Sequence, residues 1–254
     1  MTAEFARIGV AFERVEGIDA RARPDLDQMP QKVLYTKRLR LTGGEIACLL
    51  SHRACWMMIA GGDDPYVAIF EDDVVFSDEA GALLGHAGWI PADADIVKLE
   101  TFFRKTMIGR KRIVADDRFS LSRLYTDHTG TGGYIISKQT ARDLIEASKE
   151  IRVAVDDLVF NPTFPILPRK TIYQLVPALC AQDHLLGDRA IGLPSLLKEP
   201  RDVQWAAIEA AGKPRKTVAG RMKVELARVA RHIVDFCRLR RQTIVPFGPS
   251  NAKE

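Results

Sequence analysis

The sequence has no apolar run near the roughly 20 residues that a membrane-spanning helix requires. Its start, MTAEFARIGV, lacks the basic-then-apolar layout of a secretory signal peptide. No Cys-x-x-Cys pair occurs, which argues against a zinc ribbon or a disulfide framework and favours buried free thiols at Cys48, Cys55, Cys180 and Cys237. No internal repeat or low-complexity segment is present. These absences together predict a globular cytoplasmic protein.

The chain has 254 residues, 46% of them hydrophobic and 28% charged. A globular protein of this size buries roughly 75% of the surface of its unfolded chain, so one large domain with an appendage is expected. The net charge of +4 is unevenly distributed, because basic residues concentrate from Lys213 to Arg241 while the rest is slightly acidic. We therefore predict a main domain over residues 1–198, followed by a linker and a basic tail over residues 199–254.

Short apolar runs alternate with helical patterns along the main domain. The first decade predicts a short helix that leads into a strand over residues 10–18. Thr42 and Glu45 have the spacing of a capping box, and apolar residues at helical spacing follow as far as Ala60. Buried strands are expected at 66–70, 94–99, 133–136 and 173–176, with Ser137 beginning another helix. This alternation predicts an α/β fold with a mainly parallel sheet.

The tail contains a basic amphipathic pattern. Apolar residues spaced by three or four predict a helix, with arginines on its flanks, through Val218, Met222, Leu226, Val229, Ile233 and Phe236. Such a helix can lie on an anionic membrane surface, at the inner face of the cytoplasmic membrane, or can pack on the main domain. A nucleic-acid partner is disfavoured, because the basic residues are not interleaved with aromatic ones.

Three consecutive carboxylates, Glu71, Asp72 and Asp73, lie between two apolar runs. Like charges repel, so carboxylates packed in a crease of the fold need a cation. Ligands of open α/β sheets bind beyond the carboxyl ends of the strands, and Mn²⁺ or Mg²⁺ takes oxygen ligands while it keeps sites for substrate phosphates. The pattern favours a metal that holds a diphosphate. A solvated turn is the plain alternative; an aspartyl-phosphate phosphatase fits poorly, because Glu71 occupies the place of its nucleophile.

Several segments, in this order, resemble glycosyltransferase family 25: FERVEGIDA (12–20), LTGGEIACLLSHRACWMMI (41–59), AIFEDDVVF (68–76), DIVKLE (95–100), GTGGYIIS (130–137) and VDDLVF (155–160). Members of this family include galactosyl- and glucosyltransferases that build bacterial lipopolysaccharide and lipooligosaccharide. The resemblance extends to about residue 195. It implies a GT-A type fold in the main domain, a nucleotide-sugar donor and inversion at the anomeric carbon.

The resemblance also implies roles for particular residues. The acidic triplet replaces the Asp-x-Asp element of such folds, with Asp73 the first candidate metal ligand, Asp72 the second, and Mn²⁺ or Mg²⁺ the ion. An inverting enzyme needs a base for the acceptor hydroxyl, and Asp156, with Asp157 beside it, is the candidate. The alternative for both acids is the capping of a helix start.

The remaining candidates would line the donor site: Glu45, Ser51, His52, Glu71, Thr131, Gly132 and Gln182. Some have a structural alternative: Glu45 can close a capping box, His52 can be a hydrogen-bonded core residue, and the glycines can form a turn. Asp183 or His184 would complete the metal shell, or belong to a solvated loop.

Family members usually open with an apolar strand and an Arg-containing segment, ahead of the helix that here begins at Met1. The resemblance therefore implies either that the true start lies upstream or that part of the donor site is lost. The sequence predicts a metal-dependent inverting transferase that moves a hexose, galactose from UDP-galactose, onto lipopolysaccharide or a related glycan. The alternatives are a truncated, non-catalytic relative that binds glycan or membrane, and a metal-dependent phosphohydrolase.

Overall fold

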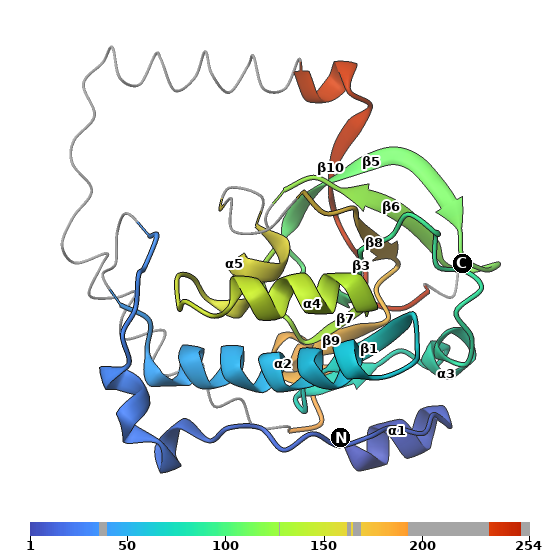
Figure 1. Cartoon of the computed structure of the whole chain (residues 1–254). Helices are drawn as coiled ribbons and strands as arrows, with labels where there is room; N and C mark the ends of the chain where they lie inside the picture. The colour runs from blue at the N-terminus through green and yellow to red at the C-terminus, as the bar shows by residue number, and fades with distance from the viewer. Residues whose placement is uncertain (36–39, 127, 162–163, 165–168, 193–233, 250–254) are drawn as a thin grey trace.

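The computed structural model describes residues 1–35, 40–126, 128–161, 164, 169–192 and 234–249 (Figure 1). The main sheet has seven strands in the order β1-β7-β3-β8-β6-β5-β10. Their bounds are Tyr66–Phe70 (β1), Ile96–Lys98 (β3), Lys105–Val114 (β5), Ser120–Leu124 (β6), Gly133–Ser137 (β7), Ile172–Val176 (β8) and Arg240–Ile244 (β10). A second, three-stranded sheet has the order β2-β9-β4, with bounds Val74–Phe76 (β2), Cys180–Gln182 (β9) and Glu100–Thr101 (β4).

The helices begin where the sequence supplies caps. The bounds of the α-helices are Thr2–Ile8 (α1), Gly43–Gly61 (α2), Ala80–Leu84 (α3), Lys138–Ala147 (α4) and Val155–Phe160 (α5). Thr42 and Glu45 make both bonds of the predicted capping box, and Ser137 accepts a hydrogen bond from the Thr140 amide at the start of α4. Short 3-10 turns occupy Ala20–Ala22 (η1), Pro24–Gln28 (η2), Asp183–Leu185 (η3) and Gly187–Arg189 (η4).

The sheet is mainly antiparallel, so the prediction of a mainly parallel sheet is wrong. Among the six pairings of neighbouring strands in the described main sheet, β3 with β8 is the one parallel pair. Short apolar runs fit a buried strand of either direction, so the pattern cannot give direction. The strand predicted over residues 10–18 is also wrong, because this described segment forms none. There the Ile18 amide donates to the Ser51 hydroxyl of α2, at 2.9 Å.

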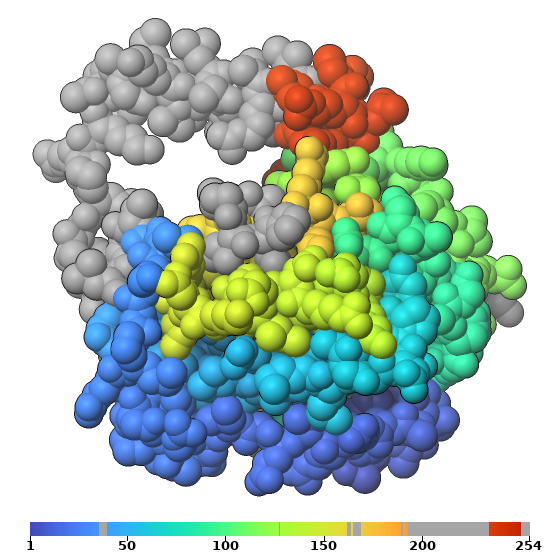
Figure 2. Space-filling view, viewed as in Figure 1, coloured from blue at the N-terminus to red at the C-terminus, as the bar shows by residue number. Residues whose placement is uncertain are grey.

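Alternating side chains of the central strands fill two cores, one on each face of the main sheet. On β7, Tyr134 and Ile136 pack with α2, α4 and α5, whereas Ile135 packs on the opposite side with residues of α1, α3 and β2. Figures 1 and 2 show α2 and α4 side by side over one face, with the amino-terminal segment along α2. The acidic triplet lies where the chain leaves one sheet for the other, between β1 and β2.

The part of the tail that the structure describes joins the main sheet. Strand β10 pairs antiparallel with β5, which is consistent with packing of this segment on the main domain. The predicted helix lies outside the described residues except for its end, and so does the predicted boundary at 198/199.

The cysteines are free, but burial was predicted correctly for Cys180 alone, since Cys48 and Cys55 are half-buried and Cys237 is exposed. None of the described helices has the length and apolarity that crossing a bilayer requires.

Candidate functional site

Glu71 connects four elements of the fold at the end of β1. One carboxylate oxygen contacts His52 Nε2 of α2 at 3.2 Å and accepts a hydrogen bond from the Thr131 hydroxyl at 2.5 Å. The other oxygen accepts from Gln182 Nε2 of β9 at 3.3 Å. Burial acts to raise the pKa of Glu71, but the His52 and Thr131 hydrogen bonds and the charge of Lys98 outweigh it and lower this pKa. Three predicted site residues, far apart in sequence, thus meet around the ionised carboxylate of a fourth, Glu71.

Asp73 and Asp72 have different environments. Asp72 is exposed, whereas Asp73 is buried and its Oδ1 atom has no hydrogen-bond partner among the described residues. Burial, followed by the charges of Glu71, Glu100 and Asp72, raises the pKa of Asp73 to about 8. A buried carboxylate oxygen without a donor is costly, which makes Asp73 the stronger of the two candidates for a cation ligand.

A buried ion pair, which the sequence interpretation missed, stands next to these acids. Lys98 and Glu100 are both 0% exposed, and Lys98 Nζ lies 3.0 Å from Glu100 Oε2. Burial raises the pKa of Glu100 to about 7, Lys98 opposes the shift, and Glu71 adds to it. The signal was visible in DIVKLE, where two charged residues flank Leu99 at the end of a buried strand. The periodicity of a strand cannot show that these two residues are buried together, because the pair contacts a loop more than 30 residues further along the chain.

The loop before β7 is held by these buried charges. Lys98 Nζ donates to the Gly130 carbonyl at 2.5 Å, and the Gly132 amide donates to Glu100 Oε2 at 3.1 Å. A Cβ atom on Gly132 would lie 2.7 Å from Glu100 Oε1, so this glycine is required for close approach to an internal carboxylate. The Gly130 carbonyl and the Gly132 amide are therefore used within the fold, whereas the Thr131 side chain reaches Glu71.

Asp156 and Asp157 lie in the first turn of α5 and have different partners. Asp156 is 9% exposed; its Oδ2 accepts from the Gly130 amide at 3.3 Å and its Oδ1 from the Asp157 amide at 3.0 Å. The loop therefore connects Asp156 to the Lys98–Glu100 pair. Asp157 accepts hydrogen bonds from the Tyr35 hydroxyl and from Asn161, which hold the surrounding backbone. Of the two acids, Asp156 is the one joined to the carboxylate cluster.

Two other candidates have structural partners in α2. Glu45 completes the capping box, as the structural alternative proposed, and Ser51 bonds to Ala47 and Ile18. Their role in donor binding stays a prediction. Asp183 is buried and its carboxylate accepts from the Ile191 and Gly192 amides, so a solvated loop is wrong for this residue.

His184, next to Asp183, is exposed, and its ring lies 6.4 Å from that of Phe102. The Asp183 amide donates to the Asp73 carbonyl at 2.8 Å. The turn after β9 is therefore attached to the acidic triplet.

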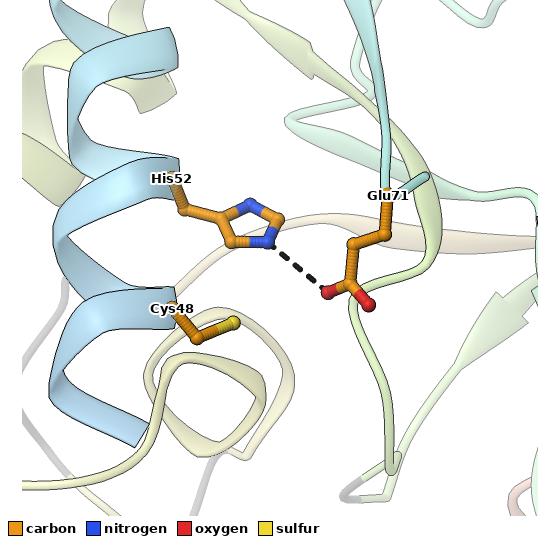
Figure 3. Close-up of side chains that lie close together, drawn as sticks. All are labelled: Cys48, His52 and Glu71. Atoms are coloured by element: carbon orange, nitrogen blue, oxygen red, sulfur yellow. Dashed lines mark hydrogen bonds and ion pairs between the residues drawn. The ribbon is translucent and has the colours of Figure 1, made fainter. Parts of the chain in front are cut away.

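Cys48, His52 and Glu71 offer atoms within 4.8 Å of one another (Figure 3), but the hydrogen bonds favour a different role for His52. Trp56 can only donate, so the Tyr134 oxygen accepts its hydrogen bond at 2.9 Å, and the Tyr134 hydroxyl is free to donate to a neutral His52 at Nδ1, 2.8 Å away. His52 Nε2 then carries the proton that it donates to Glu71. A metal at Nε2 would displace that proton, so this geometry makes His52 a support for Glu71.

A hard divalent cation suits the other acids. Asp73 Oδ1 and Glu100 Oε1 are both buried and, within the described residues, both lack a hydrogen-bond partner. Oxygen ligands of this kind suit Mn²⁺ or Mg²⁺, and a cation would offset the burial and the nearby negative charge of Glu71 that raise both pKa values. By their chemistry, each of these two oxygens could therefore serve as a ligand to such an ion.

Comparison with known proteins gives a consistent assignment. Residues 1–159 match the model of glycosyltransferase family 25, described as an LPS biosynthesis protein family. The chain is 27% identical over 253 residues to the lipooligosaccharide biosynthesis protein lic2B of Haemophilus influenzae, covering 92% of each chain.

Two further relatives are lacto-N-neotetraose biosynthesis glycosyltransferases. LgtB of Neisseria meningitidis serogroup B is 29% identical over 264 aligned positions, covering 96% of this chain and 92% of the relative. LgtE of Neisseria gonorrhoeae is 31% identical over 179 residues, covering 67% of this chain and 61% of the relative.

Proposed function

Because this chain belongs to glycosyltransferase family 25, we propose that it transfers a hexose from a UDP-sugar, galactose from UDP-galactose, to a lipopolysaccharide or lipooligosaccharide glycan. The family fixes the reaction class, and relatives named for lipooligosaccharide and lacto-N-neotetraose biosynthesis support the acceptor class. The observation that carries the mechanism is the pair of buried carboxylate oxygens, on Asp73 and Glu100, that have no donor among the described residues.

In this proposal Asp73 and Glu100 hold Mn²⁺ or Mg²⁺, and exposed Asp72 assists from the edge of the cluster. The ion supplies positive charge that stabilises the leaving nucleotide diphosphate. Glu71, fixed by His52, Thr131 and Gln182, contributes a constant negative charge and keeps the β1–β2 turn in place.

Asp156 takes the proton from the acceptor hydroxyl in a single displacement that inverts the anomeric centre. Its position supports this role, because the Gly130 loop couples it to the Lys98–Glu100 pair and thus to the metal ligands. A base held in the first turn of α5 and bonded to a neighbouring loop can keep a constant distance from the sugar carbon, which is what proton removal during attack requires.

Calorimetry tests the proposal. UDP should release heat on binding when Mn²⁺ is present and none when EDTA replaces it. Asp73→Asn should abolish this metal-dependent binding while circular dichroism shows an intact fold, and Asp72→Asn is the matched control with the smaller effect. Absence of UDP binding with metal present would favour a non-catalytic relative, and release of phosphate from simple esters would favour a phosphohydrolase.

A further inference from the structure

An apolar groove is lined by residues that follow β4, β9 and β10. Its volume is about 450 Å³, within the usual range for small-molecule sites. Two aromatic rings and three aliphatic side chains line it: Phe103, Leu185, Leu186, Pro246 and Phe247. None of these carries a charge, so the groove suits the apolar face of a ligand.

The walls of the groove are fixed in advance by hydrogen bonds. Thr101, which is 1% exposed, donates to the Val245 carbonyl at 2.6 Å and accepts from the Phe103 amide at 3.1 Å. The Ala178 amide donates to the Pro246 carbonyl at 2.8 Å, which fixes the segment after β10. The Thr101 hydroxyl thus joins the two walls of the groove, one around Phe103 and the other after β10, although they are far apart in sequence.

Phe103 has an unusual backbone conformation. Its φ angle is 51°, in the left-handed region that non-glycine residues rarely adopt, and its side chain is 38% exposed. Strained residues of this kind persist where the surroundings hold them, and they concentrate at binding sites. The Thr101 hydrogen bond holds this conformation, in which the exposed phenyl ring forms part of the groove lining.

The segments that line the groove are joined to the segments that carry the acids. Phe103 follows Glu100 and Thr101 of β4, and Leu185 ends the η3 turn, whose Asp183 amide donates to the Asp73 carbonyl. Phe102 contacts His184 between the two segments, with ring centroids 6.4 Å apart. The groove is therefore built by the same two segments, after β4 and after β9, that adjoin Glu100 and Asp73.

We propose that this groove binds the terminal sugar of the acceptor through the C–H face of its ring. The proposal rests on the function proposed above: transfer requires an acceptor hydroxyl to reach the donor's anomeric carbon, so the acceptor must bind beside the metal ligands. A pyranose ring has an apolar C–H face that packs on aromatic and aliphatic side chains, and a hydroxyl rim that stays polar. Stacking on Phe103 or Phe247 leaves that rim free to reach the donor.

Steady-state kinetics test this assignment with Phe103→Ala and Phe247→Ala. Phe236→Ala is the matched control, because Phe236 is 66% exposed and outside the groove lining. The acceptor panel is methyl β-D-glucopyranoside, methyl β-D-galactopyranoside and methyl N-acetyl-β-D-glucosaminide, titrated at saturating UDP-galactose with Mn²⁺. We expect the KM for the acceptor to rise about tenfold in each groove variant, equivalent to about 1.4 kcal/mol, with an unchanged KM for the donor.

Slow hydrolysis of UDP-galactose without acceptor separates this inference from the function on which it rests. If the groove variants hydrolyse the donor like the wild type but need more acceptor, the groove is the acceptor site. An acceptor KM that stays unchanged in both variants overturns the inference and leaves the transferase intact. A higher donor KM would instead assign the groove to the nucleotide. If the wild type itself does not bind UDP-galactose, the proposed function is refuted.

Discussion

Lys98→Met removes the positive member of a fully buried ion pair, after which Glu100 Oε2 keeps the hydrogen bond from the Gly132 amide at 3.1 Å. The methionine side chain retains most of the volume, so the perturbation is electrostatic. Removing one partner of a buried pair costs about 3–5 kcal/mol, because the remaining charge is uncompensated. The Gly130 carbonyl also loses the Lys98 donor.

Urea unfolding at about pH 8 should show this loss, because Lys98 lowers the pKa of Glu100, and without Lys98 the buried Glu100 is either charged without a partner or must take up a proton. For a chain of this size the same loss lowers the thermal midpoint by roughly 10 °C. The double variant Lys98→Met/Glu100→Gln should recover most of the stability, because no unpaired charge stays buried.

The matched control is Lys149→Met, which removes one partner of an exposed pair with Glu146. Exposed ion pairs contribute about 0–1 kcal/mol, so the control should lose little. A loss below about 1 kcal/mol in Lys98→Met would refute the reasoning, as would a double variant no more stable than the single one.

Three further predictions concern the site. In EDTA the stability should fall as pH rises between about 4 and 8, since the folded pKa values of Asp73 and Glu100, about 8 and about 7, exceed their usual 3.8 and 4.5. A pKa difference of one between the folded and unfolded states corresponds to about 1.4 kcal/mol, and urea titrations should show a smaller slope in Asp73→Asn. Asp156→Asn should lower kcat roughly 10²–10⁴-fold with little change in UDP binding, whereas Asp157→Asn, at a position that contacts Tyr35, should mainly lower the thermal midpoint. Gly132→Ala should weaken metal binding by calorimetry, because its Cβ would lie 2.7 Å from Glu100 Oε1; unchanged Mn²⁺ affinity would contradict the assignment of Glu100 as a ligand.

Local sequence patterns were sufficient to specify the structure immediately around the site. Thr42 and Glu45 specify the start of α2, because capping depends on residues three apart. The apolar run ending at Phe70 specifies β1, and the three carboxylates that follow fix where the acidic turn lies. Each of these features depends on neighbours within a few positions, and family likeness added the reaction class.

Features that depend on long-range pairing became visible in the folded chain alone. Strand direction came from the placement of β7 between β1 and β3, which no local pattern encodes. Folding also buries Asp73 while it leaves the neighbouring Asp72 exposed, and it brings Lys98 and Glu100 into contact with the loop that contains Gly130. The physical reason is that burial, desolvation and the carboxylate oxygens without hydrogen-bond donors arise from contacts between distant segments. Periodicity and capping, in contrast, report contacts within one segment.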